Sequence, residues 1–109
     1  MSLLHRGDVV ALPPPRSAKG HEQRGRRYAV VLQSAALARL STVVVAPTST
    51  GAQATRFRPA VRIRGRETRL LIEQLQTVDR SRLAKPVGHL SVREMDDVEE
   101  ALRILLGLF

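Results

Sequence analysis

The fold class of this chain is decided by one stretch of sequence, Tyr28-Ala-Val-Val-Leu-Gln-Ser-Ala-Ala-Leu-Ala-Arg-Leu-Ser-Thr-Val-Val-Val-Ala-Pro47. It contains two continuous apolar runs of strand length, Tyr28–Leu32 and Thr42–Ala46, and Pro47 ends the second run. Valine is frequent in both runs, and a run without polar alternation is typical of a strand that is buried on both faces. The connection between them, Ser34–Leu40, is long enough for one helical turn. Two buried strands this close together predict a β-rich fold.

Shorter strands are expected on either side of this pair. The upstream strand ends before Pro13-Pro14-Pro15, because proline cannot donate a hydrogen bond to a neighbouring strand. Downstream of Arg58, apolar residues alternate with arginine, which is typical of a strand with one buried face. Gly65 supplies a hairpin turn into the strand that follows. The further strands predicted in this way are Val9–Leu12, the alternating segment with Val61 and Ile63, Thr68–Ile72, a short strand before Asp79, and Val87–Leu90.

The C-terminal segment is predicted to be a helix. Ser91 and Glu94 form the Ser-x-x-Glu pattern of a capping box, which satisfies backbone donors at a helix start, and Gly107 can end the helix. Apolar residues at spacings of three and four form one stripe: Val92, Met95, Val98, Leu102, Leu105 and Phe109. Strands followed by one helix in 109 residues predict a single domain, residues 1–109. Its expected fold is mainly β, a small curled antiparallel barrel with the C-terminal helix packed on it.

The chain is strongly basic, with 18 Lys and Arg against 10 Asp and Glu and a net charge of +8. All but two of the basic residues are arginine, whose planar guanidinium matches phosphate oxygens in a bidentate manner. Five of the acids gather between Glu94 and Glu100. Without those five and their neighbours Arg93 and Arg103, 16 basic and 5 acidic residues leave +11. This distribution favours a nucleic acid partner over a basic surface that serves solubility alone.

Composition also excludes several classes of protein. The chain has no cysteine, which excludes disulfides, thiolate chemistry and zinc–thiolate sites. No apolar run approaches the roughly 18–20 residues that span a membrane, and no apolar stretch follows the start as in a signal peptide. A cytoplasmic location without a membrane partner is therefore expected. The three histidines are scattered, with no ladder of Asp or Glu nearby, so neither a metal site nor a cofactor is expected.

Four blocks of sequence carry a resemblance to a known family. They are Arg6-Gly-Asp8 with Gly20-His-Glu-Gln-Arg-Gly-Arg-Arg27 and the apolar strand after it, Val44-Val-Ala-Pro-Thr-Ser-Thr50, Glu73-Gln-Leu-Gln-Thr-Val-Asp-Arg-Ser-Arg-Leu83, and Gly88-His-Leu-Ser91 with the closing helix. In this order they resemble the MazF/PemK family of toxin endoribonucleases over nearly the whole chain. The resemblance implies an SH3-like barrel of the CcdB/PemK type that acts as a homodimer. It also implies metal-independent, sequence-selective cleavage of single-stranded RNA, inhibited by a cognate, acidic, MazE-like antitoxin.

The chemistry of metal-free RNA cleavage indicates which residues carry it. The 2′-hydroxyl attacks its own phosphate, which needs a base, an acid for the leaving oxygen and positive charge beside the phosphate. Arg27 opens one strand and Thr48 closes the next, so antiparallel pairing would bring them together. Arg27 is expected to stabilise the phosphate and is a candidate for the acid, while Thr48 holds the phosphate. Relative to the family pattern one residue is missing after Pro47, so Ser49 is the alternative catalytic hydroxyl.

The basic loop before Arg27 supplies further candidates. Glu22 is predicted to orient Arg27 or to bind a hydrogen-bond donor on a base, and the alternative is an ordinary ion pair within the loop. His21 is either a general base or a surface residue. Where the family has Arg-Pro, this chain has Arg27-Tyr28. The residues predicted to contact RNA are Arg16, Lys19, His21, Gln23, Arg24, Arg26, Arg56 and Gln74.

Two other functions are compatible with the same barrel. The related CcdB proteins are non-enzymatic poisons of DNA gyrase, and a plain RNA-binding barrel would bind without cleaving. The combination of Glu22, Arg27 and Thr48 favours the nuclease, because a protein that only binds does not need it. Aromatic residues make up only 3% of the chain, so base recognition is expected to depend mainly on hydrogen bonds from loops and on arginine stacking.

Overall fold

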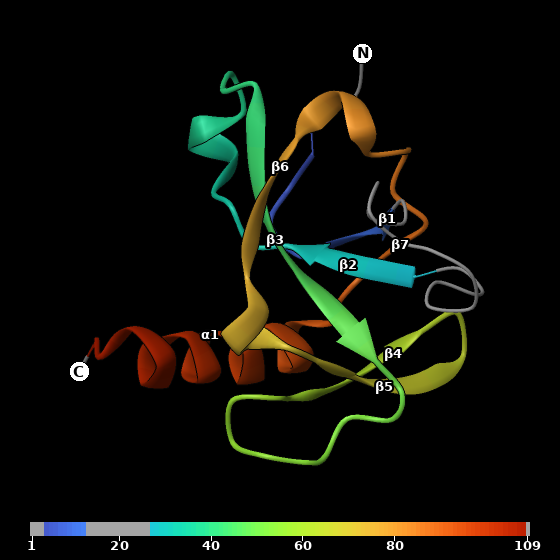
Figure 1. Cartoon of the computed structure of the whole chain (residues 1–109), viewed down its shortest axis with the longest axis vertical. Helices are drawn as coiled ribbons and strands as arrows, with labels where there is room; N and C mark the ends of the chain where they lie inside the picture. Colours follow the sequence, from blue (N-terminus) through green and yellow to red (C-terminus); the bar gives the residue numbers. More distant parts are fainter. Residues whose placement is uncertain (1–3, 13–26, 109) are drawn as a thin grey trace, which may run out of the picture.

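Seven strands and one α-helix follow one another in the residues that this computed structural model describes, 4–12 and 27–108 (Figure 1). The strands are β1 (Asp8–Leu12), β2 (Arg27–Val31), β3 (Thr42–Ser49), β4 (Ala60–Ile63), β5 (Arg66–Leu70), β6 (Gln76–Asp79) and β7 (Gly88–His89). The helices are α1 (Val92–Leu106) and the single 3-10 turns η2 (Ala35–Leu37), η3 (Ile72–Gln74) and η4 (Arg80–Arg82). Within these residues no helix has the length and apolar character needed to cross a membrane.

All paired strands are antiparallel, in the order β4-β5-β3-β2-β1-β7, with β6 beside β3. The long strand β3 organises the barrel because its two halves have different neighbours on one side. Its first half, Thr42–Val45, pairs with β6, and its end, from Thr48, pairs with β5. This change of neighbour bends the sheet, and α1 lies against the resulting barrel (Figure 1). The predicted fold, a small antiparallel barrel with a C-terminal helix, is confirmed.

The first turn of α1 is bonded to the edge strand β4 through Glu94. The predicted capping box is present: Glu94 N–H donates to Ser91 Oγ at 3.1 Å, and Ser91 N–H donates to Glu94 Oε1 at 2.8 Å. The second carboxylate oxygen, Glu94 Oε2, accepts the backbone N–H of Arg62 in β4 at 2.7 Å. Burial acts to raise the pKa of Glu94, but hydrogen bonds from these two backbone donors hold it below its usual range. One carboxylate therefore caps a helix and ties down a sheet edge.

A second carboxylate holds β7 against β1. The side chain of Asp8 is largely buried; its Oδ2 accepts the His5 N–H at 2.8 Å, and its Oδ1 lies 2.9 Å from His89 Nδ1. Gly7, just before it, has φ +98°, and a Cβ at this position would lie 3.0 Å from the His89 ring. We refer to Gly7, Asp8, His89 and Glu94 together as the closing seam, because they join the first strand, the last strand, the helix and β4.

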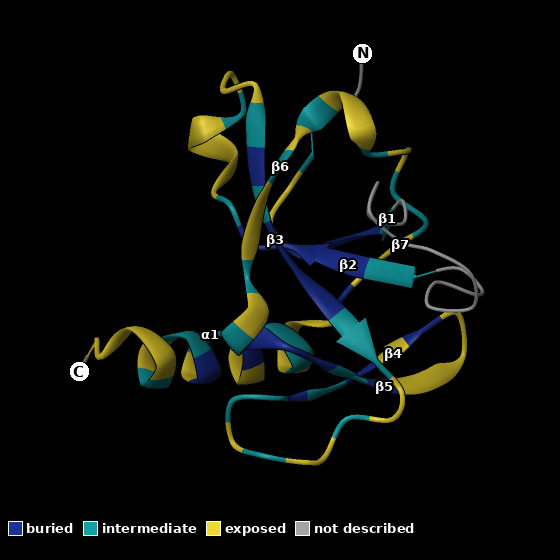
Figure 2. Ribbon diagram, viewed as in Figure 1, coloured by how far each residue is buried: buried dark blue, intermediate teal, exposed yellow. Residues whose placement is uncertain are grey.

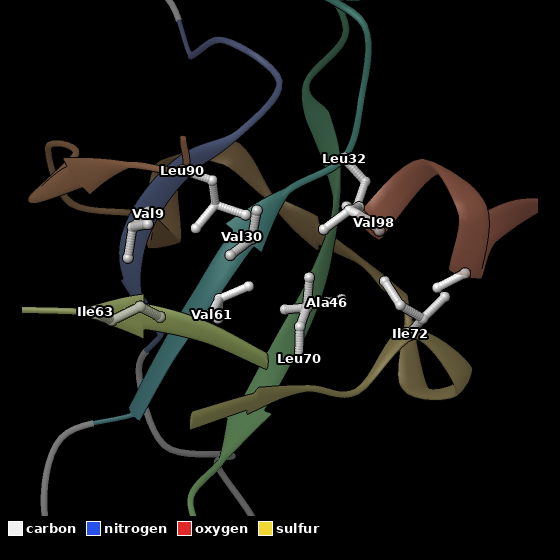
Figure 3. Close-up of a cluster of buried hydrophobic side chains, with 11 residues drawn as sticks. Val9, Val30, Leu32, Ala46, Val61, Ile63, Leu70, Ile72, Leu90 and Val98 are labelled. Atoms are coloured by element: carbon white, nitrogen blue, oxygen red, sulfur yellow. The ribbon is translucent and has the colours of Figure 1, made fainter. Parts of the chain in front are cut away.

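Most of β2 is buried (Figure 2), and its residues belong to two apolar clusters, one on each face of the sheet. Val30 points into the barrel, whereas its neighbours Ala29 and Val31 lie on the opposite face. The barrel interior, drawn in Figure 3, contains Val9, Val30, Leu32, Ala46, Val61, Ile63, Leu70, Ile72, Leu90, Val98 and Ala101. The outer apolar layer contains Val10, Ala29, Val31, Val43 and Val45. The prediction that β2 is buried on both faces is confirmed.

Pro47 does not end the third strand, as the sequence predicts, but lies inside it. β3 continues to Ser49, and Pro47 is among the most deeply buried residues. Its carbonyl accepts the Leu71 N–H at 2.8 Å, so its nitrogen faces the same edge of β3. At that edge β6 pairs only as far as Val45 and β5 pairs only from Thr48. A proline is tolerated there because it falls at the change of neighbour, where no strand needs its missing donor.

Other details also differ from the prediction, and the last strand, β7, spans only Gly88–His89 within the predicted Val87–Leu90. The fifth strand ends at Leu70, because the chain turns into η3 at Ile72. The apolar stripe of α1 is narrower than expected: Val92 is 81% exposed, and Ala101 is buried in its place beside Val98. Val92 lies about 120° around the helix from Val98 at 3.6 residues per turn, so it misses the barrel. Leu105 is 38% exposed because the last turns of α1 project past the barrel (Figure 1); Phe109 lies outside the described residues.

Candidate active site

Arg27 and Thr48 lie at the adjoining ends of two antiparallel neighbours, as the sequence predicts. β2 begins at Arg27 and β3 ends just after Thr48, with Ala29 opposite Pro47 in the register between them. Beside this pair, the Thr48 hydroxyl donates a hydrogen bond to the Tyr28 carbonyl at 3.1 Å. The start of β2 and the arrowhead of β3 lie on the side of the β4–β5 hairpin (Figure 1). Strand pairing thus brings the start of β2 beside the end of β3.

A cavity of about 250 Å³ lies between these strand ends and the β4–β5 hairpin. Arg27, Thr48 and Ser49 all line it, so the described residues that were predicted to be catalytic share one hollow. The hairpin adds Arg66 and Thr68 to its wall. Two guanidinium groups among several hydroxyls form an arrangement that can hold a phosphate group. We refer to this hollow as the Arg27 cavity.

The turn of the β4–β5 hairpin sets where this wall lies. Arg64 and Gly65 have φ of 52° and 82°, so both central residues are in the left-handed region. This is the geometry of the type I′ turn that matches the twist of paired strands, and it confirms the predicted hairpin at Gly65. Ile63 and Arg66, one on each side of the turn, then both reach the Arg27 cavity.

Arg27 also lines a second cavity, of about 210 Å³, beside the side chains that border the outer apolar layer. Gln74, at the end of η3, lines this second cavity, together with Gln76 and Arg82. The exposed side chain of Gln74 and the half-buried Arg27 therefore face the same hollow. Arg27 lines both cavities, so it lies where the two hollows adjoin.

Both candidate hydroxyls remain in the Arg27 cavity. Thr48 lies opposite Leu70 of β5, and Ser49 lies opposite Arg69. Each is half-buried, so each is shielded from bulk water yet accessible from the cavity. They also differ in bonding, because the Thr48 hydroxyl donates to the Tyr28 carbonyl, which fixes its position at the strand junction.

Several predicted site residues cannot be placed beside this cavity. Glu22 and the loop residues Arg16, Lys19, His21, Gln23, Arg24 and Arg26 lie outside the described residues. Arg56 is exposed in the segment between β3 and β4 and lines neither of the two cavities. Its neighbour Arg58 is held by Glu73, with Arg58 Nη2 2.6 Å from Glu73 Oε2, and this contact lowers the pKa of Glu73. The arginines of this segment are therefore separate from the Arg27 cavity.

Two of the histidines do have an acidic neighbour, which corrects the expectation from sequence. His5 and His89 both lie beside Asp8, His89 with its Nδ1 2.9 Å from Asp8 Oδ1 and His5 with its Nδ1 3.9 Å from Oδ2. The sequence hides this cluster because Asp8 and His89 are 81 positions apart. In residues 4–12 and 27–108 no group of three His, Asp or Glu side chains is arranged to hold a metal ion.

Sequence reasoning missed five residues of the Arg27 cavity: Tyr28, Thr50, Ile63, Arg66 and Thr68. Thr68 is 7% exposed and has the same strand parity as the buried Leu70. The period-two alternation of β5 could therefore have predicted that the Thr68 side chain points inward. No local pattern reveals that the hairpin brings this threonine to the strand ends of β2 and β3.

Comparison with known proteins identifies relatives over nearly the full chain. The family model of "PemK-like, MazF-like toxin of type II toxin-antitoxin system" matches residues 5–106. Rv3098A of Mycobacterium tuberculosis, named as a candidate toxin, is 41% identical over 97% of this chain and 100% of its own length. Endoribonuclease EndoA of Bacillus subtilis is 35% identical over 97% of each chain. A solved MazE-MazF structure from Deinococcus radiodurans contains a chain that superposes with a TM-score of 0.79 and 26% identity, covering 100% of both chains.

Proposed function

We propose, on the premise that this chain belongs to the PemK-like, MazF-like toxins of type II toxin–antitoxin systems, that it is an endoribonuclease. It would cut single-stranded RNA at the Arg27 cavity without a metal ion. The observation that carries this proposal is that Arg27, Thr48 and Ser49 line one cavity at the junction of β2 and β3. The relative EndoA is itself named an endoribonuclease.

The cleavage step follows from the groups in this cavity. The 2′-oxygen of a ribose attacks the adjacent phosphorus, and the bond from phosphorus to the 5′-oxygen breaks. This leaves a cyclic phosphate on one fragment and a 5′-hydroxyl, once protonated, on the other. Arg27 stabilises the negative charge that develops on the phosphate oxygens, since it is a fixed cation beside the reacting group. Arg27 is also our candidate for the proton donor to the leaving oxygen.

The Thr48 hydroxyl would hold the phosphate in place. In the free protein the Thr48 hydroxyl donates its only proton to a hydrogen bond with the Tyr28 carbonyl. To donate to a phosphate oxygen, this hydroxyl turns from the carbonyl to the substrate when RNA binds. Ser49 is the alternative holder, and Glu22 or His21 would supply the base for the 2′-hydroxyl.

RNA contacts would extend from the Arg27 cavity on both sides. Gln74, in the second cavity, would offer its amide to a neighbouring nucleotide, and Arg56 would bind a more distant phosphate. The basic loop residues Arg16, Lys19, Gln23, Arg24 and Arg26 would contact phosphates, because arginine and lysine bind a polyanion mainly through charge. We place this activity in the cytoplasm, where RNA is available.

The proposed partners are a second copy of the chain and an acidic antitoxin. A two-fold dimer would double the basic field along an RNA strand. An antitoxin tail that carries acids between apolar anchors would meet Arg24, Arg26 and Arg27 and thereby block RNA. The solved MazE-MazF structure is the reason to expect a MazE-like partner. Sedimentation at micromolar concentration tests the dimer, and charge reversal at Arg24 and Arg26 tests the antitoxin contact.

One experiment separates this function from its alternatives. The purified protein is incubated with a mixed RNA in excess EDTA, and an Arg27→Ala variant serves as the matched control. We expect the wild type to cut RNA and the variant to leave it intact. Activity that disappears with EDTA and returns with magnesium would contradict the metal-free mechanism. RNA binding without any cutting would indicate a binding barrel, and neither binding nor cutting would favour a gyrase poison of the CcdB type.

A further inference from the structure

One wall of the Arg27 cavity has no task in the cleavage step. Tyr28 from β2, Ile63 from β4 and Thr68 from β5 lie on this wall. They are an aromatic residue, an aliphatic residue and a hydroxyl, and Arg66, the cross-strand partner of Ile63, also lines the cavity. A flat, mainly apolar group with polar edges is the kind of ligand that such a wall suits.

Thr68 is the unusual member of this wall. The residue is 7% exposed, and its hydroxyl oxygen is buried without a hydrogen-bond partner among the described residues. A buried hydroxyl without a partner destabilises a fold, so a ligand that supplies the partner gains from it. A rotation of about 120° about χ1 can bring the hydroxyl of threonine to the position of its methyl group, and the methyl group then takes the position of the Cβ hydrogen. The cavity that Thr68 lines is where the hydroxyl can then meet a ligand.

Tyr28 gives the same wall an aromatic group. It is the only tyrosine, the chain has no tryptophan, and it stands where the family pattern has proline. Its side chain is half-buried and packs against the interior cluster, so the ring is held by the barrel. Ile63, which is 6% exposed, closes the wall from the hairpin.

The size of the cavity limits the ligand. Its volume of about 250 Å³ lies just below the roughly 300–1,000 Å³ of pockets for drug-sized ligands, so it suits one small flat group. We propose that this wall binds one nucleobase of the RNA beside the scissile phosphate. Tyr28 provides the stacking surface and the Thr68 hydroxyl bonds to the base edge, which makes Thr68 a specificity-determining residue. This inference rests on the proposed function, because it identifies a base next to the bond that is cut.

The replacement Thr68→Val tests the inference, because valine has the shape of threonine without the hydroxyl. The fold should be as stable as the wild type or more stable, since an unpaired buried polar atom is removed. Cleavage of the preferred sequence should nevertheless fall about five- to tenfold, and the preference for one base next to the cut should flatten. Thr68→Ser is the matched control, which keeps the hydroxyl and should keep the preference. Cleavage of a random RNA library, with the ends sequenced, measures this preference.

A binding measurement separates failure of this inference from failure of the proposed function. A fluorinated tyrosine incorporated in the chain gives a single fluorine resonance, because Tyr28 is the only tyrosine. Single-stranded DNA lacks the 2′-hydroxyl nucleophile, so it can be added without being cut. We expect short DNA strands to shift the resonance, and Thr68→Val to weaken the binding.

Each outcome of the two measurements has one interpretation. If the wild type cuts RNA but the fluorine resonance does not move, the base site is wrong and the nuclease stands. If the resonance moves with DNA but RNA is not cut, the base site stands and the nuclease is wrong. If Thr68→Val keeps the full base preference of the wild type, or lowers its melting temperature like a lost structural contact, the role of Thr68 is overturned.

Discussion

The closing seam and the Arg27 cavity use polar side chains in opposite ways. In the seam, both oxygens of Asp8 and both oxygens of Glu94 have a partner, and three of these four partners are backbone N–H groups. In the cavity, Arg27 has no ion-pair partner among the described residues, and the Thr68 hydroxyl has no partner there either. The hydrogen-bonded carboxylates of the seam stabilise the barrel, whereas Arg27 and the Thr68 hydroxyl are available to a ligand. The comparison separates residues that keep the fold from residues that act on a substrate.

The largest effect is expected at Arg27. Arg27→Ala should lower RNA cleavage by about 1,000-fold or more, as loss of an arginine that stabilises a phosphate does elsewhere. Its melting temperature should stay close to that of the wild type, because a half-buried arginine at a strand start is not part of the core. Arg39→Ala is the control, since Arg39 is exposed in the connection between β2 and β3, lines neither cavity and has no proposed RNA contact. An Arg27→Ala protein that unfolds would show that the cavity also serves stability.

The next effect distinguishes the two hydroxyls. Thr48→Ala should lower cleavage by about 100-fold, by analogy with the loss of one donor to a developing oxyanion. Ser49→Ala, at the adjacent position in the same cavity, should have a much smaller effect. Single-turnover rates on one RNA measure both variants. The reverse order of effects would assign the catalytic hydroxyl to Ser49.

At the closing seam, a change should affect stability instead of activity. Gly7→Ala should destabilise the fold by about 2–3 kcal/mol, because φ is +98° and the new Cβ would lie 3.0 Å from the His89 ring. Denaturant unfolding measures the loss. Gly88→Ala is the matched control, since a Cβ at Gly88 meets nothing within 4 Å. Cleavage per folded molecule should be unchanged in both variants, and a loss of it in Gly7→Ala would break the separation of the two regions.

The smallest effect concerns the pH dependence of the seam. Glu94→Gln should lose about 1 kcal/mol at neutral pH, because an amide has only one acceptor oxygen for two backbone donors. The folded pKa of Glu94 is lowered, so its contribution is full above the unfolded value, about 4.3, and disappears as pH falls through the folded value. The stability difference between wild type and variant should therefore vanish in strong acid. Glu100→Gln, an exposed acid on the same helix, should show no such difference.

The sequence could predict those features of the fold and the site that residues close together in the chain determine. The capping box at Ser91 and Glu94 is local, and the junction of Arg27 with Thr48 follows from the pairing of consecutive strands. The second bond of Glu94, to Arg62, joins positions 32 apart, and no periodicity points to it. Pro47 lies inside β3 because no neighbouring strand needs a backbone N–H at its position, and a local sequence rule cannot show this. The unpaired state of Thr68 is likewise a property of the assembled hairpin and not of any motif.

The seam also bears on the order in which the protein forms. Asp8 and His89 are 81 positions apart, and Arg6 reaches Glu99 across 93 positions at 2.6 Å. In contrast, the strands around the Arg27 cavity pair within residues 27–70, over connections of at most ten residues. Contacts of low sequence separation form early, while joining distant segments is slow. During synthesis the cavity walls can therefore assemble first, and the barrel locks only when its last strand and helix have been made.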